Sequence, residues 1–178
     1  MPVYPYMLMD EAKSQGVRMS IVKASRSMND EMPRHVLGLA ANGLRSSGKP
    51  LRRARVTVLG ISYRPNVKET RFSPALELIS LLRRRGARVT VHDPKFSCDE
   101  IGKLGLVAEP TLKKAVEKAD CVIIAVAHDE FKRLDARDLT AAMSRSPVIV
   151  DCVHIMDPAS VEKSRATYRG VGRGLWTR

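Results

Sequence analysis

Short apolar runs alternate with amphipathic stretches along most of this chain. The apolar run at 56–58 precedes Gly60, a pattern typical of a buried strand that stops where the backbone needs a residue without a Cβ. After a polar loop, apolar residues recur at helical spacing at Ala75, Leu78, Ile79 and Leu82. Apolar runs at 89–91, 121–126 and 148–150 predict further strands.

The helix predicted between the first two strands has signals at both ends. Ser73 is a good N-cap residue, and Pro74 suits the first helical turn. The basic residues 83–85 favour the last turn, and Gly86 is a natural stop. Strand, helix and strand therefore form a right-handed βαβ unit, whose first loop is where open α/β sheets bind ligands.

Strands and helices keep alternating after this unit. The chain is therefore predicted to be an α/β protein, with a Rossmann-like parallel sheet that has helices on both faces and is preceded by a linking helix. Residues 21–45 have helical periodicity, which Pro33 should kink or restart. A polar linker at 46–50 separates a helical segment, 1–46, from a sheet domain, 55–174.

Three segments lack a regular pattern. Met1–Leu8 is rich in proline and is expected to be extended. Ser97–Glu109 is expected to be irregular, and the glycines after Tyr168 predict a flexible tail.

Composition and cysteine usage limit the class of protein. The 178 residues are 44% hydrophobic and 28% charged, which is usual for a soluble globular protein. No apolar run is long enough to cross a bilayer and no signal-peptide pattern is present, so a cytoplasmic location is expected. Cys98, Cys121 and Cys152 lack metal-ligand spacing, which favours free thiols in a reducing compartment and no metal site.

The positive charge is unevenly distributed. The formal net charge is +12, and residues 51–95 hold eleven Lys or Arg and three acids, a net of +8. Residues 96–178 have a net of only +1, from thirteen basic and twelve acidic residues. A loop facing phosphates would have this charge, and so would a solvated face. Aromatic residues are only 4%, so nucleic acid is a less favoured partner.

The polar loop after the first strand holds three basic residues, Arg64, Lys68 and Arg71. They come just before a helix N-terminus, where free N–H groups also favour anions, so the loop could bind a diphosphate or could be a solvated basic loop. The pattern G-x-G-x-x-G is absent, so this is not the dinucleotide fingerprint.

Two other strand ends carry chemically capable side chains. His128 follows the strand at 121–126 and could face a ligand, although a surface histidine in a polar loop is favoured. Cys152 and His154 follow the last predicted strand, where a nucleophile–base pair is a less favoured alternative because no acid or oxyanion loop is evident.

Several short motifs occur in a characteristic order: Gly60–Asn66, Arg71, Ser73–Glu77, Asp93-Pro94, Glu130-Phe131, Asp151 and Tyr168–Arg173. Together they resemble the C-terminal domain of the UDP-glucose/GDP-mannose dehydrogenase family. Upstream, Ser25–Pro33 resembles the helix that joins the two domains of that family, and Pro2–Tyr6 resembles the segment just after its catalytic cysteine. The resemblance covers residues 1–174.

The resemblance implies part of an NAD-dependent UDP-sugar 6-dehydrogenase of polysaccharide biosynthesis. Such enzymes oxidise the sugar C6 hydroxyl to a carboxylate with two NAD and a cysteine-bound thioester. Their N-terminal domain binds NAD and their C-terminal domain binds UDP. By position, Tyr63 and Arg64 would face the UDP-sugar, and Arg71 would reach the NAD phosphates.

The family's catalytic cysteine and NAD domain precede the first residue of this sequence. No catalytic residue is therefore expected within it, and the isolated chain is expected to be inactive. The implied partners are a UDP-sugar, a separate NAD-binding chain and further copies of this chain. Without the missing domain, the stripe Met28, Met32, Val36 and Leu39 should be exposed or self-associate.

Some positions depart from the family's pattern. Tyr4 stands where many members have a catalytic Asp, Arg64 replaces a Lys, and Val153 replaces a substrate-binding Arg. A non-catalytic nucleotide-sugar-binding or dimerisation module is therefore the alternative. The substrate is UDP-glucose or a UDP-N-acetylhexosamine, and His128 before Glu130 resembles the second branch.

Overall fold

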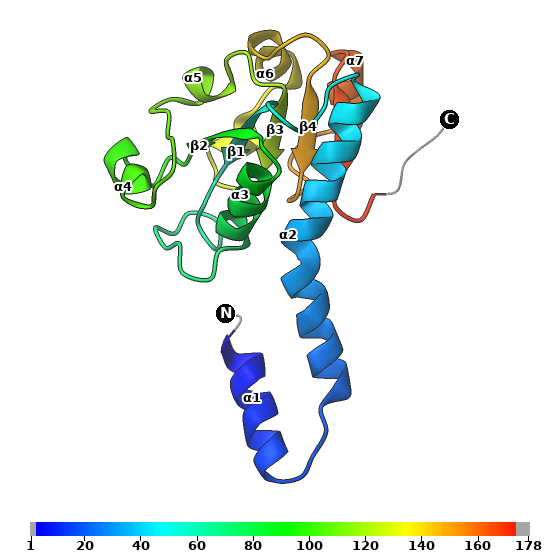
Figure 1. Cartoon of the computed structure of the whole chain (residues 1–178). Coiled ribbons are helices and arrows are strands. Elements are labelled where there is room, and N and C mark those ends of the chain that lie inside the picture. Colours follow the sequence, from blue (N-terminus) through cyan, green and yellow to red (C-terminus); the bar gives the residue numbers. More distant parts are fainter. Residues whose placement is uncertain (1–2, 174–178) are drawn as a thin grey trace.

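The computed structural model describes residues 3–173, which form one parallel sheet with helices on both sides and a helical hairpin that projects from it (Figure 1). The strands are β1 (Arg55–Leu59), β2 (Arg88–His92), β3 (Cys121–Ile124), β4 (Val148–Asp151) and β5 (Thr167–Gly170). They lie in the order β2-β1-β3-β4-β5, and every adjacent pair is parallel. The predicted fold class is confirmed.

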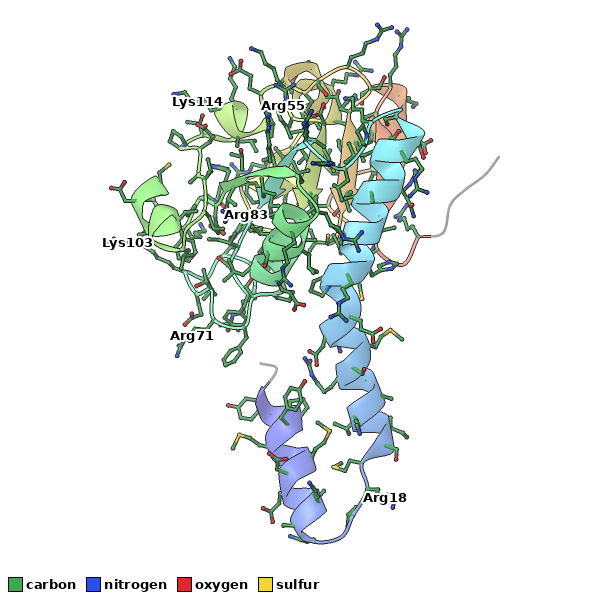
Figure 2. All side chains as sticks on the ribbon, viewed as in Figure 1. Arg18, Arg55, Arg71, Arg83, Lys103 and Lys114 are labelled. Carbon is green, nitrogen blue, oxygen red and sulfur yellow. The ribbon has the colours of Figure 1, made fainter. Side chains whose placement is uncertain are left out.

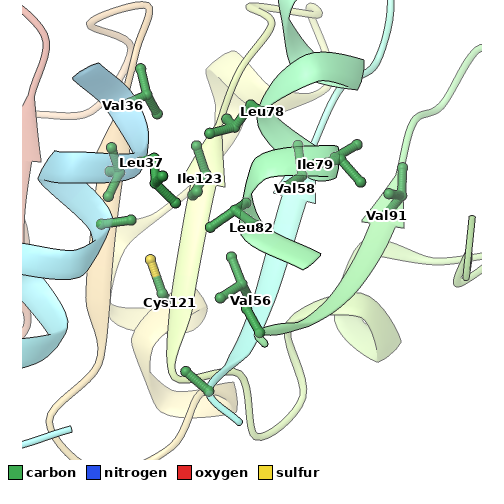
Figure 3. Close-up of a cluster of buried hydrophobic side chains, with 14 of the residues drawn as sticks. Val36, Leu37, Val56, Val58, Leu78, Ile79, Leu82, Val91, Cys121 and Ile123 are labelled. Carbon is green, nitrogen blue, oxygen red and sulfur yellow. The ribbon is translucent and has the colours of Figure 1, made fainter. Parts of the chain in front are cut away.

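The two faces of the sheet are covered by different helices. On one face, α2 (Ser20–Ser46) and α3 (Pro74–Arg84) pack on Val56, Val58 and Ile123 (Figure 3). On the other, Leu59 and Ile124 pack with residues from α5 (Leu112–Val116), α6 (Ala136–Ala142) and α7 (Pro158–Lys163). Because successive strand residues point to opposite faces, a continuous apolar run supplies both cores.

The predicted ends of α3 are confirmed. The Ser73 side chain accepts a hydrogen bond from the Ala75 N–H, Pro74 is the first helical residue, and Gly86 has a φ of 81° just beyond the end. Since both ends are fixed by local chemistry, the sequence determines them without help from tertiary contacts.

The second half of α2 belongs to the core of the sheet domain. Val36 is only 5% exposed, so the prediction of an exposed apolar stripe is wrong there, although Met28 is 67% exposed. A Cβ added at Gly43 would lie 2.6 Å from Val148 Cγ1, so this glycine lets α2 approach β4 closely. The boundary between the helical segment, 1–46, and the sheet domain, 55–174, stays a prediction. Residues 36–44 pack with the sheet wherever that boundary is drawn.

Two segments predicted to be irregular are helical. The first helix, α1 (Val3–Ser14), contains Pro5 in its first turn, where a missing N–H costs no intrahelical hydrogen bond. The second, α4 (Cys98–Lys103), begins with a capping box in which Ser97 and Glu100 each accept the other's backbone N–H. A short 3₁₀ helix also follows β3 at Phe131–Arg133.

The prediction of a flexible tail from Tyr168 is wrong as far as Gly170, because Thr167–Gly170 forms the edge strand β5. The Tyr168 ring is buried in the core, and its burial favours pairing with β4 over flexibility. Gly174 lies outside the described residues.

Candidate functional site

A pocket of about 300 Å³ lies at the carboxyl ends of β1, β3 and β4. It is lined by the loop after β1 (Ser62–Pro65), by the segments that follow β3 and β4, and by α2 and the start of α3. The strand order turns back between β1 and β3, and open α/β sheets bind ligands at this point. The position of the pocket agrees with the ligand loop predicted from the sequence.

The loop that joins β1 to α3, residues 60–73, is held by the buried carboxylate of Asp93. Asp93 Oδ2 accepts hydrogen bonds from Ile61 N (2.8 Å), Ser62 N (3.3 Å) and Ser62 Oγ (3.3 Å). Its Oδ1 accepts the Lys95 N–H at 2.9 Å. Burial alone would raise the pKa of Asp93, but the hydrogen bonds from His128, Ile61 and Lys95 outweigh it, and the pKa lies below its ordinary value.

His128 joins this carboxylate to the far part of the loop. The imidazole is fully buried, with Nε2 3.3 Å from Asp93 Oδ2 and Nδ1 3.0 Å from the Asn66 backbone N. The Asn66 N–H can only donate, so Nδ1 accepts and the proton is on Nε2, which donates to Asp93. The ring edge packs on Phe131. The prediction of a surface histidine is therefore wrong, and His128 supports the loop from beneath.

Asn66 fixes the same part of the loop through its side chain. Its Nδ2 donates to Asp129 Oδ2 at 2.8 Å, and its Oδ1 accepts the Asp129 N–H at 3.2 Å. Its φ of 59° is left-handed, a conformation that asparagine tolerates better than most residues. These bonds join the β1–α3 loop to the segment after β3.

The three basic residues predicted to form a phosphate site have different environments. Only Arg64 lines the pocket, and its guanidinium lies 5.3 Å from the centre of the Tyr63 ring. Lys68 instead pairs with Glu100 at 2.5 Å. No acidic side chain within residues 3–173 pairs with Arg64, so its charge faces the pocket uncompensated.

Arg71 lies at an exposed bend of the loop, away from the sheet (Figure 2). Its side chain is 80% exposed, and its guanidinium donates two hydrogen bonds to Glu69 Oε2. Hydrogen bonds from Arg71 lower the pKa of Glu69 to about 2, just as Lys68 and the capping box do for Glu100. Contact between Arg71 and a cofactor stays a prediction.

The thiol–imidazole pair considered after β4 does not form. Cys152 lines the pocket, but burial and the nearby Asp151 raise the pKa of its thiol to about 12. His154 Nε2 is instead 2.6 Å from the Val171 carbonyl oxygen. A protonated thiol without a base is a poor nucleophile.

Asp93 and Asp151 are structural carboxylates at this end of the sheet, a role that the sequence motifs containing them did not indicate. Besides Asp93, Asp151 is fully buried and accepts hydrogen bonds from Val153 N (3.0 Å), Met156 N (2.8 Å) and the Tyr168 hydroxyl (3.4 Å). Burial and Asp151 raise the pKa of Tyr168 to about 12. The sequence signal that could have found both carboxylates is an aspartate at the end of a strand, Asp93 after β2 and Asp151 at the end of β4.

A second hollow of about 620 Å³ continues the pocket toward the helical hairpin. The two share Met32, Pro33, Tyr63, Ser73 and Pro74. The added part is more polar and includes Tyr6, Asn29 and an Arg26–Asp30 ion pair. Together the two hollows form a cleft with an apolar inner part and a polar outer part.

Within residues 3–173, no cluster of His, Cys, Asp and Glu side chains could hold a metal ion. In the same part of the chain, no helix is both long enough and apolar enough to cross a bilayer.

Comparison with known proteins gives one consistent result. Residues 57–158 match the sequence model of the UDP-glucose/GDP-mannose dehydrogenase family, UDP binding domain. A UDP-glucose 6-dehydrogenase of Rhizobium meliloti is 29% identical over 168 residues, which are 93% of this chain and 37% of the relative.

Solved structures agree with the sequence match. A UDP-D-ManNAc dehydrogenase of Pyrococcus horikoshii superposes with a TM-score of 0.80 and 29% identity, over 97% of this chain and 38% of that one. An NDP-N-acetyl-D-galactosaminuronic acid dehydrogenase of Methanosarcina mazei Go1 gives 0.83 and 25%, over 94% and 36%. The chain thus spans little more than a third of the length of these relatives.

Proposed function

The chain belongs to the UDP-glucose/GDP-mannose dehydrogenase family, and on that premise we propose that it is the UDP-binding part of an NAD-dependent, cytoplasmic UDP-sugar 6-dehydrogenase. The observation that carries the proposal is the pocket at the strand-order reversal, with Tyr63 and Arg64 on one side and the α3 N-terminus on the other. Relatives named for UDP-glucose and for UDP-N-acetyl-D-mannosamine both match, which supports UDP-glucose or a UDP-N-acetylhexosamine as the sugar nucleotide.

The pocket suits a nucleoside diphosphate for three reasons. Arg64 offers a planar fork of donors that forms no salt bridge with an acidic side chain of residues 3–173, and the N-terminus of α3 favours negative charge. The inner walls are largely apolar, and they offer a surface on which the base and ribose of a nucleotide can pack. Val153 adds no charge where the family's pattern has an Arg, so phosphate recognition depends more heavily on Arg64.

NAD, if it binds this chain, would contact it at Arg71, and when bound it would accept the hydride from the sugar. Arg71 is exposed enough for this contact, but Glu69 already neutralises it. The loop after β1 lacks the dinucleotide glycine pattern, so we propose that another domain or chain supplies most of the NAD site. Copies of this chain would associate through the part of the helical hairpin that projects from the sheet, where Met28 of α2 is exposed.

UDP titrated into isotope-labelled protein is expected to shift the amide signals of residues 60–71, with a Kd of about 0.1–1 mM. Arg64→Ala should weaken binding several-fold, because one charged hydrogen bond contributes about 1.5–3 kcal/mol. Arg145→Ala is the matched control, since Arg145 is exposed and lies in the loop that precedes β4. Unchanged affinity in Arg64→Ala would contradict the site.

The polypeptide of residues 1–178 alone is not expected to reduce NAD with any UDP-sugar. Covalent catalysis needs a thiolate, and burial raises the pKa of both Cys121 and Cys152 far above neutrality. Nicotinamide absorbance in the presence of UDP-glucose and UDP-N-acetylhexosamines measures this. Turnover that persists after Cys98, Cys121 and Cys152 are all replaced by serine would show that the active site is misassigned.

If UDP binds and no turnover occurs, a binding or dimerisation module without catalysis remains compatible with the chain. Adding a separately produced NAD-binding domain of a relative distinguishes the two functions. Restored NAD reduction would support half of a split dehydrogenase, and unchanged inactivity would favour the module.

A further inference from the structure

Most of the charge between residues 51 and 95 lies at the other end of the sheet from the β1–α3 loop. Figure 2 shows Arg55 and Arg71 at opposite ends of the sheet domain, with the hairpin that carries Arg18 extending beyond Arg71. All strands are parallel, and Arg55 marks the end of the sheet at which they begin. We call this end, where the N-termini of the strands lie, the amino edge. The exposed basic residues of this segment near that edge are Arg52, Arg53, Arg55, Arg84, Arg85 and Arg88. The UDP pocket uses none of them.

Arginines at the amino edge are held close together by the backbone. Arg55 and Arg88 are directly opposite each other in the β1–β2 pair. The Arg53 N–H donates to the Gly86 carbonyl at 2.7 Å, and the Arg88 N–H donates to the Ala54 carbonyl at 2.8 Å. Two arginine-bearing segments therefore run side by side.

Opposed like charges on neighbouring strands destabilise a sheet, and little compensates for them here. Of the six arginines, only Arg55 has an acidic partner within residues 3–173, and the Asp120 carboxylate is 3.9 Å away. Asp120 is already bonded to Lys49 Nζ at 3.0 Å and to the Arg55 N–H at 2.9 Å. The structure thus leaves clustered positive charge for an external anion.

A hollow of about 620 Å³ lies beside this cluster, at the ends of α2 and α3. Arg45 and Arg85 line it from the two helix ends, with Ala41, Pro50 and Leu51 as apolar walls. It shares no lining residue with the UDP pocket, and within residues 3–173 no aromatic side chain lines it. We call it the amino-edge hollow.

The helix dipole explains only part of this arrangement. Arg45 and Arg84 are in the last turns of α2 and α3, where cations stabilise a helix whatever else they do. Arg52 and Arg53 are in a loop, and the opposed Arg55 and Arg88 are in strands, so the dipole accounts for none of these four.

We propose that the amino-edge hollow binds a compact oligophosphate, an anion with two or more linked phosphate groups. Guanidinium groups bind phosphate oxygens through paired hydrogen bonds, and Arg45 and Arg85 line the hollow from the ends of two different helices. Without an aromatic wall to stack a base, the phosphates supply the recognition. The ligand is therefore either a free inorganic oligophosphate or the phosphate chain of a nucleotide.

The probe is inorganic tripolyphosphate, titrated by calorimetry into the 178-residue chain at low salt, with orthophosphate as the weak comparison. Tripolyphosphate should bind and shift the amides of residues 45–52 and 84–88 at lower concentrations than it shifts residues 60–71, where recognition also needs the nucleoside. Arg45→Ala/Arg85→Ala should weaken it by about tenfold or more. If ATP displaces tripolyphosphate from this hollow, the ligand of the hollow is a nucleotide. If ATP does not displace it, the ligand is a free oligophosphate.

Arg165→Ala is the matched control, because Arg165 is exposed at the same edge, before β5, and does not line the hollow. It should bind tripolyphosphate as the parent chain does. Three results would each overturn the proposal: an unchanged affinity in the double variant, orthophosphate binding as tightly as tripolyphosphate, or an equal loss in Arg165→Ala. An equal loss together with binding of a short DNA duplex would identify a nucleic-acid surface along the whole edge.

Discussion

Replacing Asp93 by alanine is expected to lower the free energy of unfolding by about 3–4 kcal/mol. The substitution leaves the N–H groups of Ile61 and Ser62 and the His128 Nε2–H without their buried acceptor. Urea denaturation followed by far-UV circular dichroism measures the change. Amide signals of residues 60–71 should also broaden, because the carboxylate holds the start of that loop directly and holds Asn66 through His128.

Asp10→Ala removes an exposed carboxylate on α1 and is the control, with an expected change below about 0.5 kcal/mol.

Acid titration gives a second measurement. The folded pKa of Asp93 is lowered, so its stabilisation is complete above the unfolded value of about 3.9 and is lost as pH falls through the folded pKa. Asp93→Ala should lack that part of the acid sensitivity. If the parent chain and Asp93→Ala lost stability equally as the pH falls, that result would contradict the role given to Asp93.

Gly60→Ala is expected to destabilise the fold by about 2–5 kcal/mol. Gly60 has a φ of 89°, and an added Cβ would lie 2.6 Å from Val126 Cβ and 3.2 Å from the Val126 backbone nitrogen. Neither atom can move easily, because Val126 leaves β3 beside the start of the β1–α3 loop. The urea midpoint measures the loss, and UDP binding should weaken with it.

Gly102→Ala provides the opposite expectation. Gly102 is inside α4, has no left-handed φ, and a Cβ there would meet nothing within 4 Å. Alanine is the better helix former, so stability should rise by about 0.5–1 kcal/mol. If the two substitutions had similar effects, close packing at Gly60 would not be the cause.

Local chemistry is what made the central part of the fold predictable. Ser73, Pro74 and Gly86 fix the ends of α3 through their own backbone preferences, and doubly buried strands read as continuous apolar runs. The position of the ligand pocket followed from the same βαβ unit. Arg64 could therefore be placed near it from the loop's own residues, whereas Tyr63 was placed there by the family resemblance.

What the sequence could not supply depends on contacts between distant segments. Whether His128 is exposed is decided by Asp93 and Asn66, which are 35 and 62 residues away in sequence. The distribution of charge had the same difficulty, because residues close in sequence, such as Arg55 and Arg64, lie at opposite ends of the parallel sheet. Strand β5 was missed because Thr167–Gly170 contains no apolar run: one face of the strand is polar and its last residue is a glycine.

The packing of α2 affects the order in which the chain can fold. Helix α2 precedes every strand in sequence, but Gly43 packs on Val148 of β4, and Ser47 Oγ lies 3.2 Å from Thr167 Oγ1, a separation of 120 residues. During synthesis, α2 can dock on α3 early, but its remaining apolar face has no partner until β4 and β5 have formed. Long-range contacts of this kind slow folding and leave apolar surface exposed to aggregation in the meantime. The nascent chain should therefore need chaperone protection until its last strand has been released.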